Sequence, residues 1–529
     1  MIWVDREVKK IKERKLPLEW VDDMKTPSGR IHVGALRGVV IHDLIYKVLV
    51  ESDINAKFTY VFDDHDPMDA IPSYLDFATW EKYAGRQLFQ IPSPASGYKS
   101  FAEYYAKEFQ KVFETINCHP KIIWASHLYK SGKMNGVIKE VLDAAYKIRE
   151  IYYQVAKATK PDSWYPFNVV CEKCRKVGTT QVYKWDGEFV YYRCLPQMVA
   201  WAKGCGYEGK TTPFDGNGKI PWKVEWAAKW KVIGVTIEGA GKDHMSKGGS
   251  HDIASAICRE VLNYQAPYPI AYEWFTVGGK KMSSSKGVGS SAYEVSQILP
   301  PDVFRFFIVR TPIETHLDFN PFGQTILNIF DDYDHCLNAY FDKLEQKIPK
   351  RKQGEVMLDF ARIFELSAVY PPPKKRIVLP RFRTIVNLIK TKTDILKFFE
   401  NQKRTKLTKE EKQILEERII YAQAYLQKYA GEEEKLKFLE ELPAGLTLTK
   451  SQKEYLKNLS DRLKNLKTAS REELQKAVFD VLKQGNFQPE EVFKGFYQVL
   501  IGRDFGPKAA DLILEFGVEK VRERLKKIL

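Results

Sequence analysis

The segment from residue 18 to residue 48 most constrains the fold, because it has the pattern of a strand, a glycine-containing turn and a helix. The apolar run Leu18–Val21 predicts the strand. After the turn, apolar side chains recur close to every 3.6 residues, at Leu36, Val39, Val40, Leu44 and Val48. This order places Ser28 to Gly34 at a helix N-terminus, where backbone amides and the helix dipole favour a phosphate group.

Further apolar runs predict the rest of a parallel α/β sheet. The candidate strands are Phe58–Phe62, Ile122–Ala125, Val232–Ile237 and Ile270–Phe275, and they alternate with helical patterns. A longer, irregular region from about residue 75 to 230 interrupts this sheet. The Pro-rich, basic segment 371–376 predicts a loop, and the chain beyond it is strongly helical, with a capping box at residues 470–473.

Composition narrows the function classes without deciding among them. Lys and Arg outnumber Asp and Glu by 83 to 68, which gives a net charge of +15. Such a surplus favours a polyanionic partner, although a solvated surface rich in Lys–Glu pairs would have the same composition. No apolar run approaches the roughly 20 residues of a membrane span, and the N-terminus lacks a signal-peptide pattern. We therefore expect a cytoplasmic protein.

Four of the seven cysteines have the number and partly the spacing of a closed zinc site. Cys171 and Cys174 form a Cys-x-x-Cys pair, and Cys194 and Cys205 follow with a wider spacing. Four thiolates suit tetrahedral zinc, whereas a disulfide framework is not expected in a cytoplasmic chain. The wide second spacing predicts a short helix between residues 195 and 203.

A second zinc site is predicted from mixed ligands. Glu114 and Cys118 are four residues apart and would share one face of a helix, and His119 and His127 lie close by in the sequence. Glu, Cys and His together suit zinc. The alternative is a buried free cysteine with surface histidines.

Two motifs far apart in the chain carry most of the chemistry. The first is the stretch Thr-Pro-Ser-Gly-Arg-Ile-His-Val-Gly-Ala at residues 26–35, and the second is Lys-Met-Ser-Ser-Ser-Lys-Gly at residues 281–287. In this order and spacing they resemble the HIGH and KMSKS signatures of class I aminoacyl-tRNA synthetases. The resemblance implies a site where ATP activates an amino acid as its adenylate.

The resemblance assigns roles to individual residues. His32, Lys281 and Lys286 would be catalytic, by stabilising charge on the phosphates. Ala35 stands where the family has a second histidine, and Ser284 stands where it has the second lysine, so which lysine reaches which phosphate stays open. The residues implied in ATP binding are Ser28, Gly29, Gly34, Asp243, Met282, Ser283, Ser284 and Ser285.

An acidic segment follows the second predicted strand. Asp63, Asp64, His65 and Asp66 would lie at the C-terminal edge of the sheet, where ligands bind in open α/β folds. Three carboxylates there suit a metal ion or a substrate ammonium, and a capping turn is the simpler alternative.

Several segments together resemble the class I lysyl-tRNA synthetases over essentially the whole chain. They are the first motif, the Asp-Asp-His-Asp segment, residues 241–252 and residues 502–508. The resemblance implies a Rossmann-type α/β catalytic domain (1–75 and 230–290), a zinc-bearing insertion (76–229), a stem-contact region (291–350) and an all-α anticodon-binding domain (351–529).

This family implies lysine, ATP with Mg²⁺ and lysine tRNA as substrates, and structural zinc. Lysine requires an anionic pocket for its ammonium, which Asp64 and Asp66 would supply, and an apolar wall for its stem. Trp222 and His244 match the family's amino-acid site. A glutamyl enzyme, whose pocket would be cationic, and a non-catalytic tRNA-binding paralogue are the alternatives. The sequence leaves the oligomeric state open.

Overall fold

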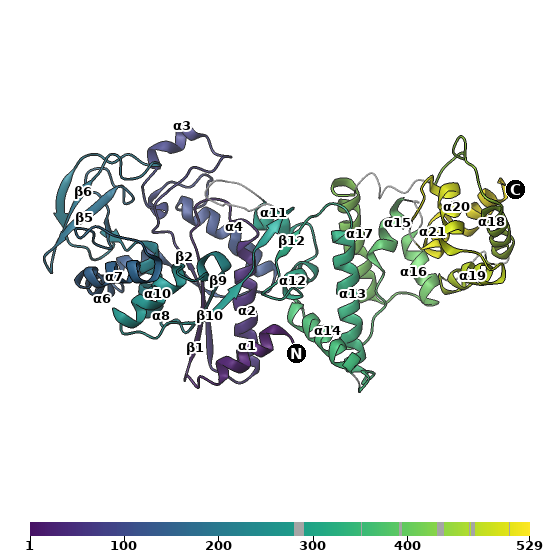
Figure 1. The fold of residues 1–529 in the computed structure, drawn as a ribbon, viewed down its shortest axis with the longest axis horizontal. Coiled ribbons are helices and arrows are strands. Elements are labelled where there is room, and N and C mark those ends of the chain that lie inside the picture. The colour runs from purple at the N-terminus through teal and green to yellow at the C-terminus, as the bar shows by residue number, and fades with distance from the viewer. Residues whose placement is uncertain are drawn as a thin grey trace. The chain divides into compact units, whose positions relative to one another are not determined.

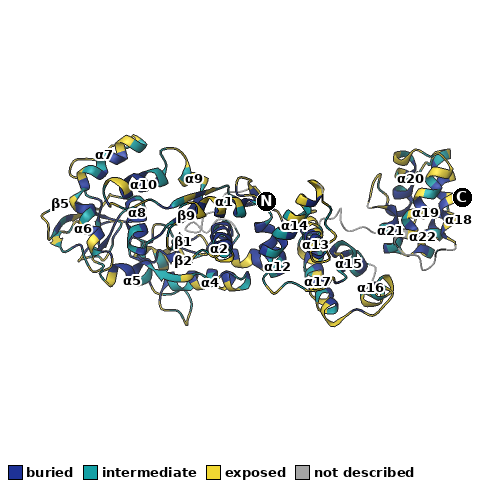
Figure 2. Ribbon diagram, turned by 90° about the horizontal axis from the view of Figure 1, so that it is seen from below, coloured by how far each residue is buried: buried dark blue, intermediate teal, exposed yellow. Residues whose placement is uncertain are grey.

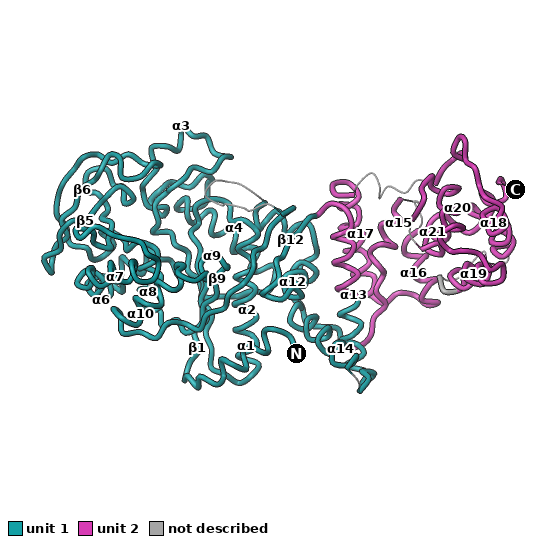
Figure 3. Tube along the Cα trace, viewed as in Figure 1, with its two compact units in different colours: residues 1–320, 335–374 teal, residues 321–334, 375–529 magenta. Residues whose placement is uncertain are grey.

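The computed structural model describes residues 1–279, 290–350, 352–390, 394–430, 438–464, 466, 471–506 and 508–528. The chain divides into two compact units, coloured separately in Figure 3. Unit 1 comprises residues 1–320 and 335–374, and unit 2 comprises residues 321–334 and 375–529.

Unit 1 is built on a five-stranded parallel sheet with the strand order β10-β9-β1-β2-β3 (Figure 1). The strands are β1 (Glu19–Lys25), β2 (Ala56–Phe62), β3 (Lys121–Trp124), β9 (Ile237–Gly241) and β10 (Tyr268–Tyr272). The chain runs from β1 outward to β2 and β3, and the later strands add on the other side of β1. The order therefore reverses between β1 and β9, and ligands bind at such a switch point in α/β folds.

Helix α2 (Ala35–Glu51) follows β1 as predicted and is buried along most of its length (Figure 2). Around it lie α1 (Trp3–Lys12), α12 (Pro301–Val309) and α14 (Lys352–Ser367). Arg305 of α12 forms a fully buried ion pair of 2.6 Å with Asp43 of α2. Because both charges are removed from water, this pair fixes α12 against α2 in a single arrangement.

The predicted strand Val232–Ile237 is wrong. Residues 222–233 form α8 (Trp222–Ile233), and the strand begins only at Ile237. Gly234, at φ 93°, ends the helix in the left-handed conformation that glycine adopts without steric cost. Helix α8 packs on α10 (Ser250–Glu260) and is buried on several sides, so its apolar residues lack the one-sided pattern that identifies a helix.

The predicted strand Ile270–Phe275 is divided between two sheets. Its first part is β10, whereas Phe275 begins β11 (Phe275–Val277), which pairs in parallel with β12 (Leu317–Phe319). Short helices α9 (Lys242–Met245) and α11 (Ala292–Ser296) flank this region in the sequence.

The segment between β2 and α8 contributes β3 to the central sheet, so the predicted insertion 76–229 does not lie wholly outside that sheet. The rest of the segment contains helices and two small antiparallel sheets. The helices are α3 (Phe77–Trp80), η1 (Glu81–Tyr83), η2 (Leu88–Gln90), α4 (Phe101–Thr115), α5 (Ala125–Lys130), α6 (Asn135–Asp143) and α7 (Ala145–Ala156). One sheet joins β5 (Thr180–Trp185), β6 (Val190–Cys194) and β7 (Glu208–Thr211), and the other joins β4 (Asn168–Val169) to β8 (Gly218–Lys219).

The short helix predicted between residues 195 and 203 does not form. These residues make turns and one isolated bridge, between Val199 and Ala202. The chain folds back tightly on itself, since a Cβ added at Gly204 would lie 2.3 Å from the Leu195 carbonyl oxygen. The wider cysteine spacing is therefore a loop rather than an inserted helix.

The described residues of unit 2 contain helices and no strand. They form α15 (Phe382–Lys390), α16 (Ile395–Lys403), α17 (Lys409–Lys428), α18 (Lys450–Leu463), α19 (Arg471–Gln484), α20 (Pro489–Ile501), α21 (Ala509–Phe516) and α22 (Val518–Lys526), with part of α13 (Thr325–Leu344). Residues 371–376 lie between helices without regular structure, as predicted. The capping box at residues 470–473 falls partly outside the described residues. None of the described helices is long and apolar enough to span a membrane.

Candidate active site at the switch point of the sheet

Three strands of the central sheet deliver the predicted residues to one edge. Lys25 and Phe62, the last residues of β1 and β2, are partners in the parallel register. The first motif follows β1, the acidic segment follows β2, and α9 follows β9 directly. Because carboxyl ends of parallel strands meet at one edge, these segments surround the switch point between β1 and β9.

The first motif contacts the chain immediately after the second motif. The Val33 amide donates a hydrogen bond of 3.1 Å to the Ser290 carbonyl, and His32 forms an isolated bridge with Ser291. On the other side, the Gly279 amide donates to an Asp318 carboxylate oxygen at 2.8 Å. Residues 281–286, which hold both predicted catalytic lysines and the predicted ATP-binding residues 282–285, lie outside the described residues. The described chain that follows them is held beside His32.

His32 is a neutral donor in this environment. Burial, reinforced by the nearby Lys25 ammonium, lowers the pKa of His32 to about 3. At neutral pH the imidazole therefore carries one N–H and no charge. It can donate a hydrogen bond to a phosphate oxygen without a counter-ion.

Backbone packing explains the glycine at the start of α2. A Cβ at Gly34 would lie 2.8 Å from the Phe275 carbonyl oxygen and 2.9 Å from His32 Nδ1. The neighbouring Arg37 is buried and donates to the carbonyls of Trp274 at 2.8 Å and Thr315 at 2.7 Å. Close packing at Gly34 and the Arg37 anchor thus hold the helix start against the β10–β11 connection. Ser28 is buried in the same loop, next to Gly29.

Aromatic rings gather where β9 and α8 meet. Asp243 and His244 are exposed on α9, directly after β9. The His244 ring lies 5.4 Å from the Trp222 ring and 6.1 Å from the Trp226 ring. Trp222, the first residue of α8, is 47% exposed. It is therefore not a core residue, and it is available to a ligand at the sheet edge.

The structure gives Asp64 and Asp66 protein partners. Asp64 Oδ1 and Oδ2 accept hydrogen bonds from the Ser126 amide at 2.7 Å and the Ser126 hydroxyl at 2.5 Å. Asp66 accepts from the Thr26 hydroxyl at 2.6 Å and forms an ion pair with Lys219. Asp64 thus caps the start of α5, while Asp66 ties the first motif to the insertion.

Asp66 belongs to a buried charge belt that local sequence patterns did not reveal. We use this name for Asp63, Asp66, Lys219, Glu225 and Lys229. Glu225 lies 2.9 Å from the Lys219 ammonium and 3.1 Å from the Lys229 ammonium, and Lys229 also pairs with Asp63. Burial alone would raise the pKa of Glu225, but the two ammonium groups outweigh it and lower the pKa to about 2. Glu225 is therefore ionised at neutral pH.

Two further acids were missed because they lie inside strands. Asp22 and Glu238 are 0% and 2% exposed on the neighbouring strands β1 and β9. The predicted first strand stopped at Val21, whereas β1 continues through two aspartates to Lys25. Charged residues are rarely buried, so a run of apolar residues does not predict that the strand continues through them. The sequence does contain a pattern that could have identified them, because each acid directly follows an apolar residue of its strand.

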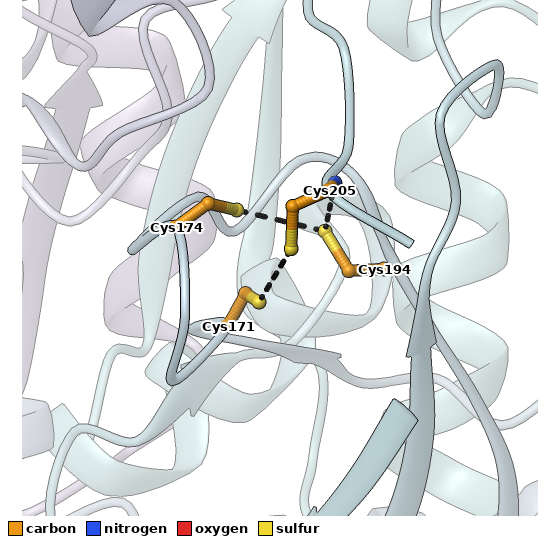
Figure 4. A group of neighbouring side chains, drawn as sticks. All are labelled: Cys171, Cys174, Cys194 and Cys205. Atoms are coloured by element: carbon orange, nitrogen blue, oxygen red, sulfur yellow. Dashed lines mark hydrogen bonds between the residues drawn. The ribbon is translucent and has the colours of Figure 1, made fainter. Parts of the chain in front are cut away.

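The four cysteines of the first predicted zinc site come together (Figure 4). Their sulfur atoms all lie within 4.8 Å of one another. The Sγ–Sγ distances are 3.6 Å for Cys171 and Cys205 and 3.6 Å for Cys174 and Cys194. Tetrahedral zinc with Zn–S bonds of about 2.3 Å requires sulfur–sulfur distances near 3.8 Å. The donor set therefore fits a closed zinc centre.

The second predicted zinc site is not assembled. Helix α4 ends at Thr115, so Glu114 and Cys118 do not share a helical face. Cys118 is buried and accepts a hydrogen bond of 3.1 Å from Arg305, whereas Glu114, His119 and His127 are exposed. Among the described residues, the four cysteines above are the only group of three or more potential ligands close enough to share a metal ion.

The family comparison agrees with this geometry. A family model described as "tRNA synthetases class I (K)" matches residues 1–369, and one described as "Anticodon binding domain" matches residues 380–529. The chain belongs to this family of class I tRNA synthetases. The matches divide the synthetase into an α/β part that holds the switch point and a helical part that begins just before α15.

Curated relatives of the synthetase extend over nearly its whole length. The "Lysine--tRNA ligase" of Methanosarcina barkeri is 32% identical over 521 residues, which cover 95% of this chain and 93% of the relative. Those of Picrophilus torridus and Methanococcus maripaludis are also 32% identical, and they cover 95% and 98% of both chains. The similarity therefore includes the insertion and the helical unit as well as the sheet.

Proposed function

We propose that the chain is a lysine–tRNA ligase. It would join lysine to ATP as lysyl-adenylate with release of pyrophosphate, and then transfer lysine to the terminal adenosine of lysine tRNA. The proposal rests on membership of the class I (K) family and on relatives named lysine–tRNA ligase over the full length. The observation that supports it best is the contact of Val33 with Ser290, which puts the His32 loop beside the described chain that follows the second motif in the sequence.

In the proposed activation step, the chain holds the triphosphate and stabilises its developing charge. Neutral His32 donates a hydrogen bond to a phosphate oxygen, and the positive end of the α2 helix dipole favours the same group. Mg²⁺, bound with ATP, would supply positive charge to the phosphate oxygens. Asp243, exposed directly after β9, would accept from the ribose hydroxyls. Lys281 and Lys286 would close over the phosphates from the second motif.

The lysine substrate would lie along α8 on the other side of the switch point. Trp222 and His244 would form part of the wall for its side chain, as their ring contact supports. We do not assign the side-chain ammonium to Asp64 or Asp66. The oxygens of Asp64 are held by α5, and Asp66 is already paired with Lys219.

We also propose that Cys171, Cys174, Cys194 and Cys205 bind a structural zinc ion, as their sulfur geometry supports. Zinc would hold the loops of the insertion together. The helical unit 2 would read the anticodon of lysine tRNA, in agreement with the family model that matches it. The net charge of +15 favours such a polyanionic partner.

Aminoacylation with each amino acid in turn, with bulk archaeal tRNA, tests this function. We expect charging with lysine alone. Charging with glutamate instead would identify the glutamyl enzyme. No charging, together with no tRNA-dependent ATP–pyrophosphate exchange, would identify a non-catalytic paralogue.

His32→Ala tests the activation step within the same assay. Because His32 would act on charge that develops in the transition state, turnover should fall about 100-fold or more while the KM for ATP changes little. Equal losses in both would mean that His32 only binds ground-state ATP.

A further inference from the structure

Asp22 and Glu238 are a pair of buried acids at the switch point itself, and no cation in the described ranges of the chain pairs with them. They are partners in the parallel register of β1 and β9, so their side chains share one face of the sheet. Neighbouring strands are about 4.8 Å apart, which brings the two carboxyl groups close together. Both are essentially inaccessible to water.

The hydrogen bonds of the pair leave one oxygen unsatisfied. Glu238 accepts from the indole N–H of Trp226 at 2.8 Å and from that of Trp230. Asp22 Oδ1 accepts from the Thr59 hydroxyl, whereas Asp22 Oδ2 has no partner. Within the described part of the chain, neither acid forms an ion pair. An unpaired carboxylate oxygen at full burial is unfavourable by several kcal/mol, so it indicates a missing partner.

The surroundings of the pair are acidic. Burial is the largest cause that raises the pKa of both groups, well above its usual range for Asp22 and to about 8 for Glu238. The charged neighbours with the largest effects are other carboxylates: Glu238, Asp23 and Asp63 for Asp22, and Asp23 and Asp63 for Glu238. A cation entering here would relieve mutual repulsion as well as desolvation.

A row of indoles leads from the surface to this pair. Trp222, Trp226 and Trp230 are spaced four residues apart on α8, and they are 47%, 6% and 0% exposed. Adjacent rings lie 6.1 Å and 5.0 Å apart. The outermost ring contacts His244 at the sheet edge, and the inner two bind Glu238. Such a wall packs well against a long aliphatic stem and attracts an ammonium group at its end.

The depth of the acids suits a long side chain. Asp22 and Glu238 each lie three residues before the end of their strand, about 10 Å below the edge where ATP would bind. A substrate whose reacting carboxyl group stays at the edge reaches the acids only through an extended side chain. Lysine, with four methylenes and a terminal ammonium, has this form.

We propose that Asp22 and Glu238 bind the ε-ammonium of the amino-acid substrate, while Trp226 and Trp230 pack along its stem. This proposal rests on the lysine–tRNA ligase function above and names the residues that determine its specificity. The ammonium donates to Asp22 Oδ2 and to Glu238, and its positive charge favours the ionised form of both acids. An uncharged substrate supplies no such charge, and glutamate brings a further carboxylate to an acidic site.

Charging kinetics with two conservative variants test the assignment. Asp22→Asn and Glu238→Gln keep size and remove charge, so each should raise the KM for lysine about 100-fold and leave the KM for ATP within about threefold. Asp23→Asn is the matched control, because Asp23 is the next residue of β1 and faces His42 on the opposite side of the sheet. It should leave the KM for lysine unchanged. An unchanged KM in both test variants overturns the proposal.

Thermal unfolding gives a second readout that does not depend on turnover. Lysine should raise the Tm of the unmodified protein, and norleucine, which has the stem without the ammonium, should not. Asp22→Asn should leave the Tm of the ligand-free protein about unchanged, because burial already raises the pKa of Asp22 and disfavours its charged form, and it should abolish the shift with lysine. An equal shift with norleucine would overturn the proposal even if the variants failed to fold. If the unmodified protein charges no lysine at all, the proposed function fails rather than this assignment.

Discussion

The charge belt and the Asp22–Glu238 pair are both buried acidic groups, about one strand apart, yet they are balanced in opposite ways. In the belt, Lys219 and Lys229 lie between three carboxylates, and burial is compensated by ion pairs inside the protein. In the pair, the carboxyl groups accept hydrogen bonds from indole and hydroxyl donors, and no cation of the described residues pairs with them. Buried acids that stabilise a fold are paired with cations of the protein itself. Buried acids that recognise a cationic ligand lack such a partner until the ligand binds.

Cys171→Ser would test whether the charge belt depends on the nearby zinc site. We expect this variant to have the largest effect. Strand β4 ends two residues before Cys171 and pairs with β8, which carries Lys219. Loss of the metal should therefore loosen the insertion and the belt together, with a stability loss on the order of 5 kcal/mol. Metal analysis and urea unfolding measure both effects. Cys118→Ser is the control and should retain zinc; a Cys171→Ser protein with full metal content contradicts the site.

Lys229→Met tests whether the belt depends on its internal cations. The variant leaves Asp63 without its ion pair in a buried position, so stability should fall by about 3–5 kcal/mol. Lys139→Met removes an exposed ion pair with Asp143 and should change stability by about 0.5 kcal/mol or less. If Lys229→Met and Lys139→Met lowered the free energy of unfolding by comparable amounts, the buried ion pair of the belt would matter no more than an exposed one.

The contributions of Glu238 and Glu225 to the free energy of unfolding should change with pH in opposite directions. We expect this effect to be the smallest of those predicted. The folded pKa of Glu238, raised by burial to about 8, exceeds its usual value of 4.5, so its contribution to stability is lost as pH rises from 4.5 through 8. The pKa of Glu225 is lowered to about 2 by Lys219 and Lys229, which outweigh burial, so its contribution is lost as pH falls from 4.5 toward 2.

Urea unfolding across pH gives the free energy of unfolding of the unmodified protein and of the Glu238→Gln and Glu225→Gln variants. The difference between the unmodified protein and each variant isolates the contribution of that glutamate. Each difference should be roughly 1–3 kcal/mol over its window. If the two contributions changed with pH in the same direction, Glu238 would be paired with a cation in the same way as Glu225 of the charge belt.

The sequence predicted what depends on local pattern. The strand, turn and helix at residues 18–48 and the Cys171–Cys174 pair each lie within a short stretch, and the structure confirms the fold they indicate. The resemblance also related the first motif to residues about 250 positions away, and Val33 indeed contacts Ser290.

The partners of the acids could not be predicted, because they depend on long-range pairing. Asp66 looked available beside a strand end, but its cation, Lys219, lies 153 residues further on. The same held for Asp64, whose oxygens are held by Ser126. Asp22 lies just beyond the predicted strand, which stopped at Val21, and is instead the buried middle of β1. A pattern identifies an acid at an edge; only the packed structure shows which acids lack a counter-ion.

The two-residue ladder between β4 and β8 makes the insertion inseparable from the sheet it interrupts. Lys219 reaches from that ladder to Asp66, and the Gly218 carbonyl accepts from His65 at 3.0 Å. Trimming residues 76–229 to obtain a minimal enzyme would remove Lys219 and Lys229 together, and it would leave Asp63 and Asp66 as neighbouring acids without their cations. A shortened version would therefore have to replace two ammonium groups at the sheet edge.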